Sequence, residues 1–328
     1  MIKTFSKILL LLLLTSCSAN SKPAESAERS ETPDTESIEV MTFDADSCFA
    51  KLKAQVDFGP RVPGSEAHKN TARFIQDELA KYGANIILQN TTTVTAQGKT
   101  IPVYNILGQY NPDCKKRILL LAHWDTRPWA DEESNAELHS KPIDGANDGA
   151  SGVAVLLELA RLMNVKAPEN TGVDLLFVDA EDSGDSGDEK SWCLGTQLWV
   201  KNMPYTSENK PQYAILLDMV GGRNAKFHRE YFSDKYARSI VNKVWSIASA
   251  SGYGSRFVNE AGGGITDDHL VINEAGIPAI DIIENNNAQT GSFNPTWHTL
   301  EDNVKNIDKS TLKAVGQVMS NFIYNKNI

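Results

Sequence analysis

Several side chains that could do chemistry follow apolar runs of the sequence, at the points where buried strands would end. These side chains are the imidazole of His123 and the carboxylates of Asp125, Glu181, Asp182 and Asp218. Two further residues of these types, Asp148 and His298, stand in short polar segments. No Cys-x-x-Cys spacing occurs, so a thiolate zinc site is not expected. Mixed nitrogen and oxygen ligands without thiolate are typical of zinc in a catalytic site.

The adjacent acids Glu181 and Asp182 suggest how such a site would work. Neighbouring side chains point in different directions, so one acid could bind the metal while the other stays free as a general base. A carboxylate held near a divalent cation in a partly dry cleft is a reasonable proton shuttle.

Each of these residues also has a simpler interpretation when it is taken alone. Asp148 would cap a helix, His123 would be a hydrogen-bonded structural residue, and His298 would belong to a surface aromatic patch. The pair Glu181-Asp182 would begin a solvated acidic loop. Five such positions at strand ends make a shared metal site the better interpretation.

The remaining histidines are expected to play lesser roles. His68 stands in a helix start and is expected at the surface, while His139 and His228 are expected to be structural. His269 follows two aspartates, so either a local hydrogen bond or a contact with substrate is open to it.

The elements that must position the site can be read from apolar patterns. Compact runs predict buried strands over 118–122, 173–178, 214–217 and 279–283, and a Thr-, Val- and Ile-rich segment predicts a pair of strands over 85–110. Helical spacing predicts helices over 65–82, 152–163, 236–250 and 309–324. Alternating strands and helices predict a three-layer α/β fold, with a mixed and largely parallel central sheet flanked by helices. In such folds ligands bind beyond the carboxyl ends of the strands.

The composition excludes several classes of protein. The chain has 328 residues, of which 41% are hydrophobic and 23% charged, which excludes collagen, coiled coil and wholesale disorder. The net charge of −10 argues against nucleic-acid binding, which needs a basic face.

The N-terminus has the pattern of an export signal. Lys3 and Lys7 precede a short apolar run at Ile8–Leu14, which is much shorter than the about 20 residues that span a bilayer. Residues 1–16 are therefore expected to be a signal peptide. Cys17 follows the small pair Thr15-Ser16 as in a bacterial lipobox, so we expect it to carry a lipid. A plain secretory signal with a chance cysteine is the alternative.

The expected domain follows a polar tether. Residues 17–38 are rich in Ser, Ala, Glu, Pro and Thr, which predicts a disordered segment, and residues 39–328 are expected to form one domain. Ser18 after the lipidated cysteine favours the outer membrane of a bacterial cell envelope, with the domain facing the periplasm. The three other cysteines are an odd number, so at least one thiol stays unpaired.

These motifs together resemble the M28 family of zinc aminopeptidases and cyclases. The resemblance rests on His-x-Asp at 123–125, GANDGASGVAVLLELAR at 145–161, the acid pair, LLDM at 216–219, the late histidine, and the segment 58–79. Within that family, AHWDTRPWAD at 122–131, ITDDH at 265–269 and FNPTWHT at 293–299 resemble the glutaminyl cyclases. Animal cyclases carry Glu-Glu where this chain has Glu181-Asp182.

The resemblance implies a role for each matching residue. One zinc ion per chain would be held by Asp148, Asp182 and His298, and Glu181 would be the acid and base. Asp218 and Asp267 would form a hydrogen-bond relay beside it. The walls of the substrate pocket would be Trp297, Phe293, Ile265 and Trp192.

The resemblance also implies roles for His123 and Asp125. His123, together with Asp218, matches the positions that bind a second metal in two-zinc relatives. Asp125 matches an acid that orients a neighbouring ligand.

The implied activity is cyclisation of N-terminal glutamine in peptides or proteins to pyroglutamate, with release of ammonia. The expected partners are peptide N-termini that bear glutamine and the membrane that takes the lipid on Cys17, and the chain is expected to be a monomer. A two-zinc aminopeptidase is the first alternative, because all five ligands are present. A surface lipoprotein that only binds peptides or glycans is the second.

Overall fold

The computed structural model describes residues 41–325, so the leader, Cys17 and the tether lie outside the described residues. Among these residues, no helix combines the length and apolar character needed to cross a bilayer.

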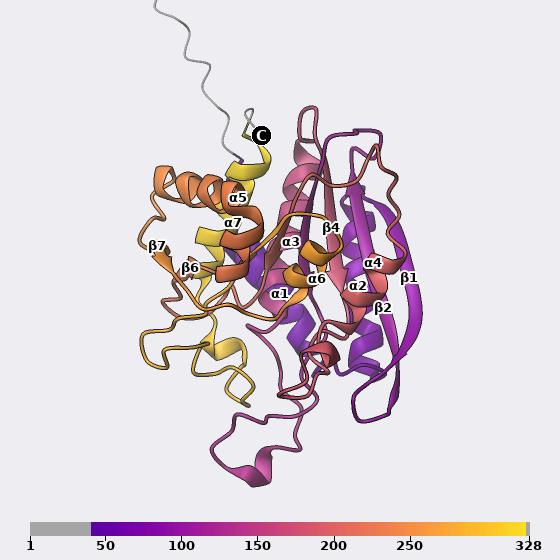
Figure 1. Cartoon of the computed structure of the whole chain (residues 1–328), viewed down its shortest axis with the longest axis vertical. Coiled ribbons are helices and arrows are strands. Elements are labelled where there is room, and N and C mark those ends of the chain that lie inside the picture. The colour runs from indigo at the N-terminus through magenta and orange to yellow at the C-terminus, as the bar shows by residue number, and fades with distance from the viewer. Residues whose placement is uncertain (1–40, 326–328) are drawn as a thin grey trace, which may run out of the picture. The chain divides into compact units, whose positions relative to one another are not determined.

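A six-stranded mixed sheet forms the centre of the domain (Figure 1). Its strands are β1 (Asn85–Val94), β2 (Thr100–Tyr110), β3 (Arg117–His123), β4 (Gly172–Val178), β5 (Ala214–Leu217) and β8 (Ala279–Ile282). The order across the sheet is β1-β2-β4-β3-β5-β8. The hairpin of β1 and β2 is antiparallel, β2 runs antiparallel to β4, and β4, β3, β5 and β8 run parallel to one another.

Helices cover both faces of this sheet and make three layers. One face carries α1 (Ala45–Asp57), α2 (Glu66–Lys81), α3 (Ala150–Val165), α5 (Tyr231–Ala250) and α7 (Lys309–Ile323). The other face carries α4 (Leu194–Lys201) and α6 (Asp268–Glu274). Successive residues of β3 alternate between the two cores, since Leu120 packs into the first and Leu119 and Leu121 into the second. The predicted fold class is confirmed.

Most predicted elements agree with the structure to within a few residues. The four apolar runs are β3, β4, β5 and β8, and the segment 85–110 is the β1–β2 hairpin. Ser65 caps α2 as expected, because its side chain accepts a hydrogen bond from the backbone of His68. The helix predicted over 236–250 begins earlier, at Tyr231, because the carboxylate of Glu230 caps two backbone N–H groups.

The short elements have no counterpart in the sequence prediction. They are α1, α4, α6, the two-stranded parallel sheet of β6 (Phe227–Arg229) and β7 (Phe257–Ala261), and the 3₁₀ turns η1 (Ala136–Leu138), η2 (Glu189–Ser191) and η3 (Val304–Asn306). Helices as short as α4 and α6 depend on tertiary packing, which a local pattern does not reveal.

The expectation that His68 lies at the surface is wrong. Its imidazole is fully buried, with Nε2 2.9 Å from a carboxylate oxygen of Asp179 and its ring stacked on Trp124 at 4.5 Å. The pairing with a buried carboxylate from the end of β4 explains why a polar ring is tolerated there. Cys48, Cys114 and Cys193 are free thiols.

Candidate active site

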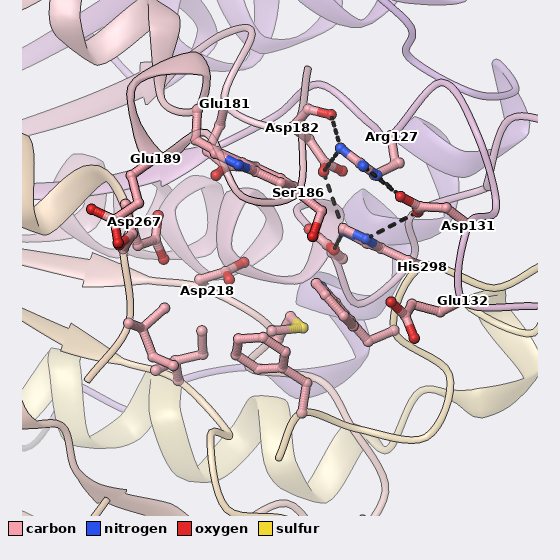
Figure 2. Close-up of a pocket in the computed structure, with 18 of the residues that line it drawn as sticks. Arg127, Asp131, Glu132, Glu181, Asp182, Ser186, Glu189, Asp218, Asp267 and His298 are labelled. Atoms are coloured by element: carbon pink, nitrogen blue, oxygen red, sulfur yellow. Dashed lines mark hydrogen bonds and ion pairs between the residues drawn. The ribbon is translucent and has the colours of Figure 1, made fainter. Parts of the chain in front are cut away.

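The predicted site residues gather at the edge of the sheet where its parallel strands end. His123 ends β3 and pairs in register with Val178 at the end of β4, so the segments that follow both strands start side by side. A cavity of about 290 Å³ lies at this edge, as Figure 2 shows. Every predicted catalytic, metal and substrate residue lines it: Asp148, Glu181, Asp182, Trp192, Asp218, Ile265, Asp267, Phe293, Trp297 and His298.

Three of these residues have the spacing of a zinc site. His298 Nε2 lies 3.2 Å from Asp182 Oδ1 and 3.6 Å from Asp148 Oδ2. Tetrahedral zinc with bonds of about 2.0 Å holds its ligand atoms roughly 3.3 Å apart. The spacing of His298 from both aspartates therefore fits a shared ion, and ligand atoms of all three residues lie within 4.8 Å of one another.

The carboxylate of Asp182 supports the same assignment. Its side chain is almost fully buried, and neither oxygen has a hydrogen-bond partner among the described residues, although Oδ1 lies close to the imidazole of His298. Burial and the neighbouring carboxylate of Asp148 raise the pKa of Asp182 to about 6, although His298 and Arg127 act in the opposite direction. A buried carboxylate without hydrogen bonds is costly, and a cation would satisfy it.

A buried arginine holds the imidazole of His298 in place. Arg127 donates to both oxygens of Asp131, from Nε at 3.0 Å and from Nη2 at 2.5 Å. Asp131 Oδ1 lies 3.4 Å from Nδ1 of His298, which leaves Nε2 facing the other two ligands. Burial alone would lower the pKa of His298, but the carboxylates of Asp182, Asp131 and Asp148 raise it to about 9.

The same arginine also fixes the loop that carries the acid pair. Its Nη1 donates to the carbonyl oxygens of Asp182 and Gly184, at 3.1 and 2.9 Å. Sequence analysis assigned no role to Arg127 or Asp131, although both stand in the quoted segment 122–131. Arg127 and Asp131 are four residues apart and carry opposite charges, and this spacing was the available sign of an ion pair.

Glu181 points into the cavity beside Asp148, Asp182 and His298. Its nearest polar contacts are the thiol of Cys193, 3.7 Å from Oε1, and Nδ1 of His123, 4.0 Å from Oε2. Burial raises the pKa of Glu181 well above its usual value, and the carboxylates of Asp182 and Asp267 add to this. A carboxyl with a raised proton affinity is suited to exchanging protons with a substrate.

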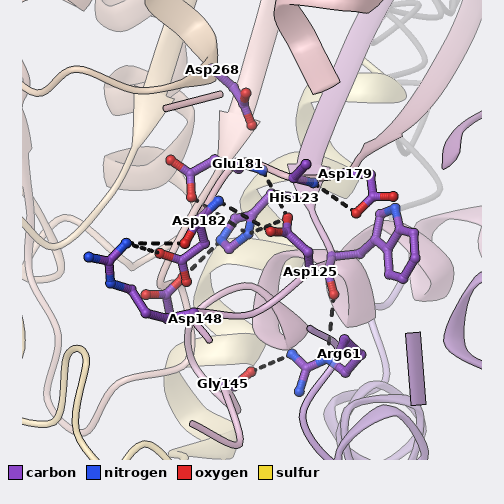
Figure 3. Close-up of polar contacts among 12 residues, drawn as sticks. Arg61, His123, Asp125, Gly145, Asp148, Asp179, Glu181, Asp182 and Asp268 are labelled. Carbon is purple, nitrogen blue, oxygen red and sulfur yellow. Dashed lines mark hydrogen bonds and ion pairs between the residues drawn. The ribbon is translucent and has the colours of Figure 1, made fainter. Parts of the chain in front are cut away.

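Asp125 anchors the backbone of the acid pair. Figure 3 shows its carboxylate beneath the turn, where it accepts hydrogen bonds from the backbone N–H groups of Glu181 and Asp182 at 3.1 and 3.2 Å. Its Oδ1 also lies 3.6 Å from Nδ1 of His123. Asp125 therefore orients Glu181 and Asp182 together.

His123 forms a second cluster with residues of the same site. Its Nε2 lies 2.9 Å from Asp148 Oδ1 and 3.2 Å from Asp218 Oδ1, and these three side chains could also hold an ion. The backbone at Gly149 passes so close that a Cβ there would lie 2.6 Å from this ring nitrogen. Any larger residue at position 149 would displace the imidazole.

Asp218 and Asp267 complete the group of acids around the cavity. Asp267 caps α6 and accepts from the backbone N–H of Asp268, and it can approach Glu181 and Cys193 within 4.8 Å. Burial raises the pKa of both Asp218 and Asp267, with neighbouring carboxylates adding to the effect. Closely spaced buried acids cannot all ionise, so protons are shared among them.

Aromatic rings form the walls. Trp297 stacks on His298 with ring centroids 3.8 Å apart, and Phe293 packs against Trp297 at 4.6 Å. The ring of Trp192 is parallel to that of His298, at 6.2 Å and with 9° between planes. The guanidinium of Arg127 lies 4.7 Å from the Trp192 ring, so the arginine braces a wall of the cavity as well.

Asp302 supports the loop that carries Asp148, although no sequence motif indicated this role. Its carboxylate accepts from the backbone N–H groups of Asn147 and Asp148 at 2.8 and 3.1 Å. Burial raises the pKa of Asp302 to about 7, and the carboxylate of Asp148 contributes. The pairing joins two segments more than 150 positions apart in sequence, so no local pattern reveals it.

The chain belongs to Peptidase family M28, whose model matches residues 105–323. Among solved structures, the glutaminyl cyclase of Bacteroides thetaiotaomicron is 48% identical, with a TM-score of 0.84, and the match covers 87% of this chain and 99% of that one. A Zn-dependent exopeptidase from Parabacteroides distasonis is 46% identical, with a TM-score of 0.84 over 88% of this chain and 100% of that one.

A more distant relative is likewise a glutaminyl-peptide cyclotransferase. The glutaminyl-peptide cyclotransferase of Gloydius blomhoffii is 23% identical over 292 residues, which are 80% of this chain and 76% of that protein. The resemblance seen in the sequence motifs is thereby confirmed at the level of the family.

Proposed function

We propose that this protein is a zinc-dependent glutaminyl-peptide cyclotransferase, which converts N-terminal glutamine of peptides or proteins to pyroglutamate and releases ammonia. One observation carries the proposal: the free carboxyl of Glu181 faces a cavity walled by Trp192 and Trp297, directly beside three zinc-compatible ligands. The similarity to a glutaminyl cyclase over nearly that whole chain supports the same reaction.

Asp148, Asp182 and His298 would hold one zinc ion per chain. When bound, zinc would act as a Lewis acid that polarises the side-chain carboxamide of the glutamine. The two oxygens of Asp182 that lack hydrogen-bond partners among residues 41–325 make this carboxylate the strongest candidate ligand of the three.

Glu181 would carry protons between the two nitrogens. Its carboxylate takes a proton from the α-ammonium of the substrate, and the amine attacks the carbon of the side-chain carboxamide. The new carbon–nitrogen bond closes the five-membered lactam, and the bond to the amide nitrogen breaks as Glu181 gives its proton to that nitrogen, which leaves as ammonia. The second proton of the ring nitrogen passes through Glu181 to solvent, so the lactam nitrogen keeps one hydrogen and Glu181 is again a carboxylate. The nucleophile is part of the substrate, so the protein mainly orients a ring closure.

The surrounding residues would tune and shield this step. The carboxylate of Asp267 raises the proton affinity of Glu181, and Asp218 in turn raises that of Asp267, so these two acids would act as a relay that helps Glu181 accept and return a proton. Trp192, Phe293 and Trp297 would limit the access of water, which would otherwise compete with the amine.

A two-zinc aminopeptidase is the second candidate, and two observations favour it. His123, Asp148 and Asp218 could hold a second ion, and an exopeptidase is among the similar structures. In that reaction Glu181 would activate water, and the products would be free glutamine and a shortened peptide. Metal analysis separates the candidates, because the cyclase is proposed to bind one zinc per chain and the aminopeptidase two.

Incubation with a glutamine-initiated peptide, followed by mass spectrometry, tests the proposal. Loss of one ammonia from the peptide is the expected result. Release of free glutamine would support the aminopeptidase instead. Glu181→Gln should abolish turnover while zinc stays bound, and full activity of this variant would exclude Glu181 as the base.

The cell-envelope location remains part of the proposal. Residues 1–16 would be removed as a signal peptide, Cys17 would carry the lipid, and 17–38 would tether the monomeric domain to an outer membrane, facing the periplasm. Cys17→Ala should move the protein from the membrane fraction to the soluble fraction of the producing bacterium. Continued membrane association of this variant would contradict lipidation at Cys17.

A further inference from the structure

Two carboxylates at the mouth of the cavity have no role in the chemistry above. We propose that Glu132 and Glu189 select peptides that carry lysine or arginine directly after the N-terminal glutamine, and disfavour those with aspartate or glutamate there. The inference rests on the proposed function and adds a substrate class to it.

The charged residues that line the cavity are mostly acidic. Eight carboxylates line it: Asp131, Glu132, Asp148, Glu181, Asp182, Glu189, Asp218 and Asp267. Arg127 is the one lysine or arginine in that lining, and it is buried and already bonded to Asp131. The arginine therefore does not offset charge at the mouth.

Exposure and pairing separate these acids into three groups. Five of them are buried in the floor, where they serve as proposed ligands, base or relay: Asp148, Glu181, Asp182, Asp218 and Asp267. Asp131 is largely buried and paired with Arg127 and His298. Glu132 and Glu189 are exposed, and the side chain of neither makes a hydrogen bond or ion pair with another residue of the described range 41–325.

Both glutamates are attached to parts of the active site. The backbone N–H of Glu132 donates to the carbonyl oxygen of His298 at 3.2 Å. Glu189 begins the η2 turn, which leads directly into Trp192 of the cavity wall. Figure 2 shows the two carboxylates on opposite sides of the cavity. A peptide whose first residue occupies the buried end of the cavity must therefore pass these two carboxylates.

The chemistry of these groups identifies the side chains that they would favour. An ammonium or guanidinium on the second residue gains attraction from both carboxylates, and an acidic side chain meets repulsion from both. Lys190, which follows Glu189, is not part of the lining. Because exposed ion pairs are weak, the preference for a basic over an acidic second residue should be roughly three- to tenfold in kcat/KM at low salt. Added salt should weaken it, because salt screens exposed charges.

The test compares peptides that differ only in their second residue, glutamine-lysine against glutamine-glutamate, at low and high salt. The wild-type protein should prefer the lysine peptide, and Glu132→Gln/Glu189→Gln should bring the ratio of kcat/KM close to one. Glu137→Gln/Glu169→Gln is the matched control. It makes the same change in net charge at exposed glutamates outside the cavity lining, and it should keep the wild-type ratio.

Equal rates for the two peptides with wild type, or an unchanged preference in the double variant, would overturn the inference. Failure to cyclise any glutamine peptide would instead refute the proposed function. In that case the binding of the same two peptides, measured by calorimetry on wild type and the double variant, still decides the inference. Equal affinity of wild type for both peptides would reject it.

Discussion

The contact between Asp131 and His298 offers a quantitative test of how the site holds its metal. Asp131→Asn keeps the shape of the side chain but removes the negative charge 3.4 Å from Nδ1 of the imidazole. The same substitution weakens the bidentate contact with Arg127, which holds Asp131 in place. The imidazole should then be less firmly oriented and less basic toward a metal at Nε2.

The structure sets the size of the effect. Opposite unit charges 3.4 Å apart attract by about 1 kcal/mol in water and by about 5 kcal/mol at an effective dielectric constant of about 20. The Asp131 side chain is 31% exposed, so solvent screening places the value in the lower part of that range. Loss of a residue that supports a metal ligand typically lowers affinity 10- to 100-fold, or about 1.4–2.7 kcal/mol, which falls within the same interval.

Competition with a coloured zinc chelator at fixed pH measures this affinity directly. Asp131→Asn should bind zinc about 10- to 100-fold more weakly than wild type. Asp113→Asn is the matched control, since Asp113 is exposed and precedes β3, away from the cavity lining. If Asp131→Asn binds zinc as tightly as wild type, the proposed orientation of His298 through Asp131 is wrong.

Three further predictions follow from the same geometry. Because the pKa of His298 is raised to about 9 in the metal-free protein, a zinc ion must displace a proton there. The apparent zinc affinity should therefore rise about tenfold per pH unit between about pH 6, the pKa of Asp182, and pH 9, as titrations at several pH values would show. Gly149→Ala should reduce both thermal stability and zinc binding, because the new Cβ would meet the backbone oxygen of His123 at 2.4 Å; an unchanged melting temperature would contradict the close packing. Arg117→Met should destabilise the fold by about 3–5 kcal/mol in denaturant unfolding, because the fully buried carboxylate of Asp174 loses its cationic partner and keeps only neutral donors such as Tyr205.

The central fold could be predicted because its strands are buried on both faces. Strands β3, β4, β5 and β8 are continuous apolar runs, and such runs need helices on either side. The polar residues that follow these runs, such as His123, Glu181 and Asp218, then had to meet at one sheet edge. Asp148 and His298 follow no strand directly, and their roles came from the resemblance to the M28 family.

The supporting residues could not be predicted in the same way. Asp302 and Arg127 act through backbone groups of distant segments, so their roles depend on how the loops fold. His68 was misplaced because its helix start resembles a surface segment, whereas its buried partner Asp179 is 111 positions away. Contacts between distant segments leave no periodicity in a single sequence.

A crystal structure of the zinc-loaded protein, with anomalous data at the zinc edge, tests the central claim most directly. One zinc peak is expected, about 2.0–2.2 Å from side-chain atoms of Asp148, Asp182 and His298, with Glu181 facing the cavity but outside the coordination sphere. A second fully occupied zinc peak bound by His123, or direct coordination by Glu181, would contradict a single-ion site with a free glutamate.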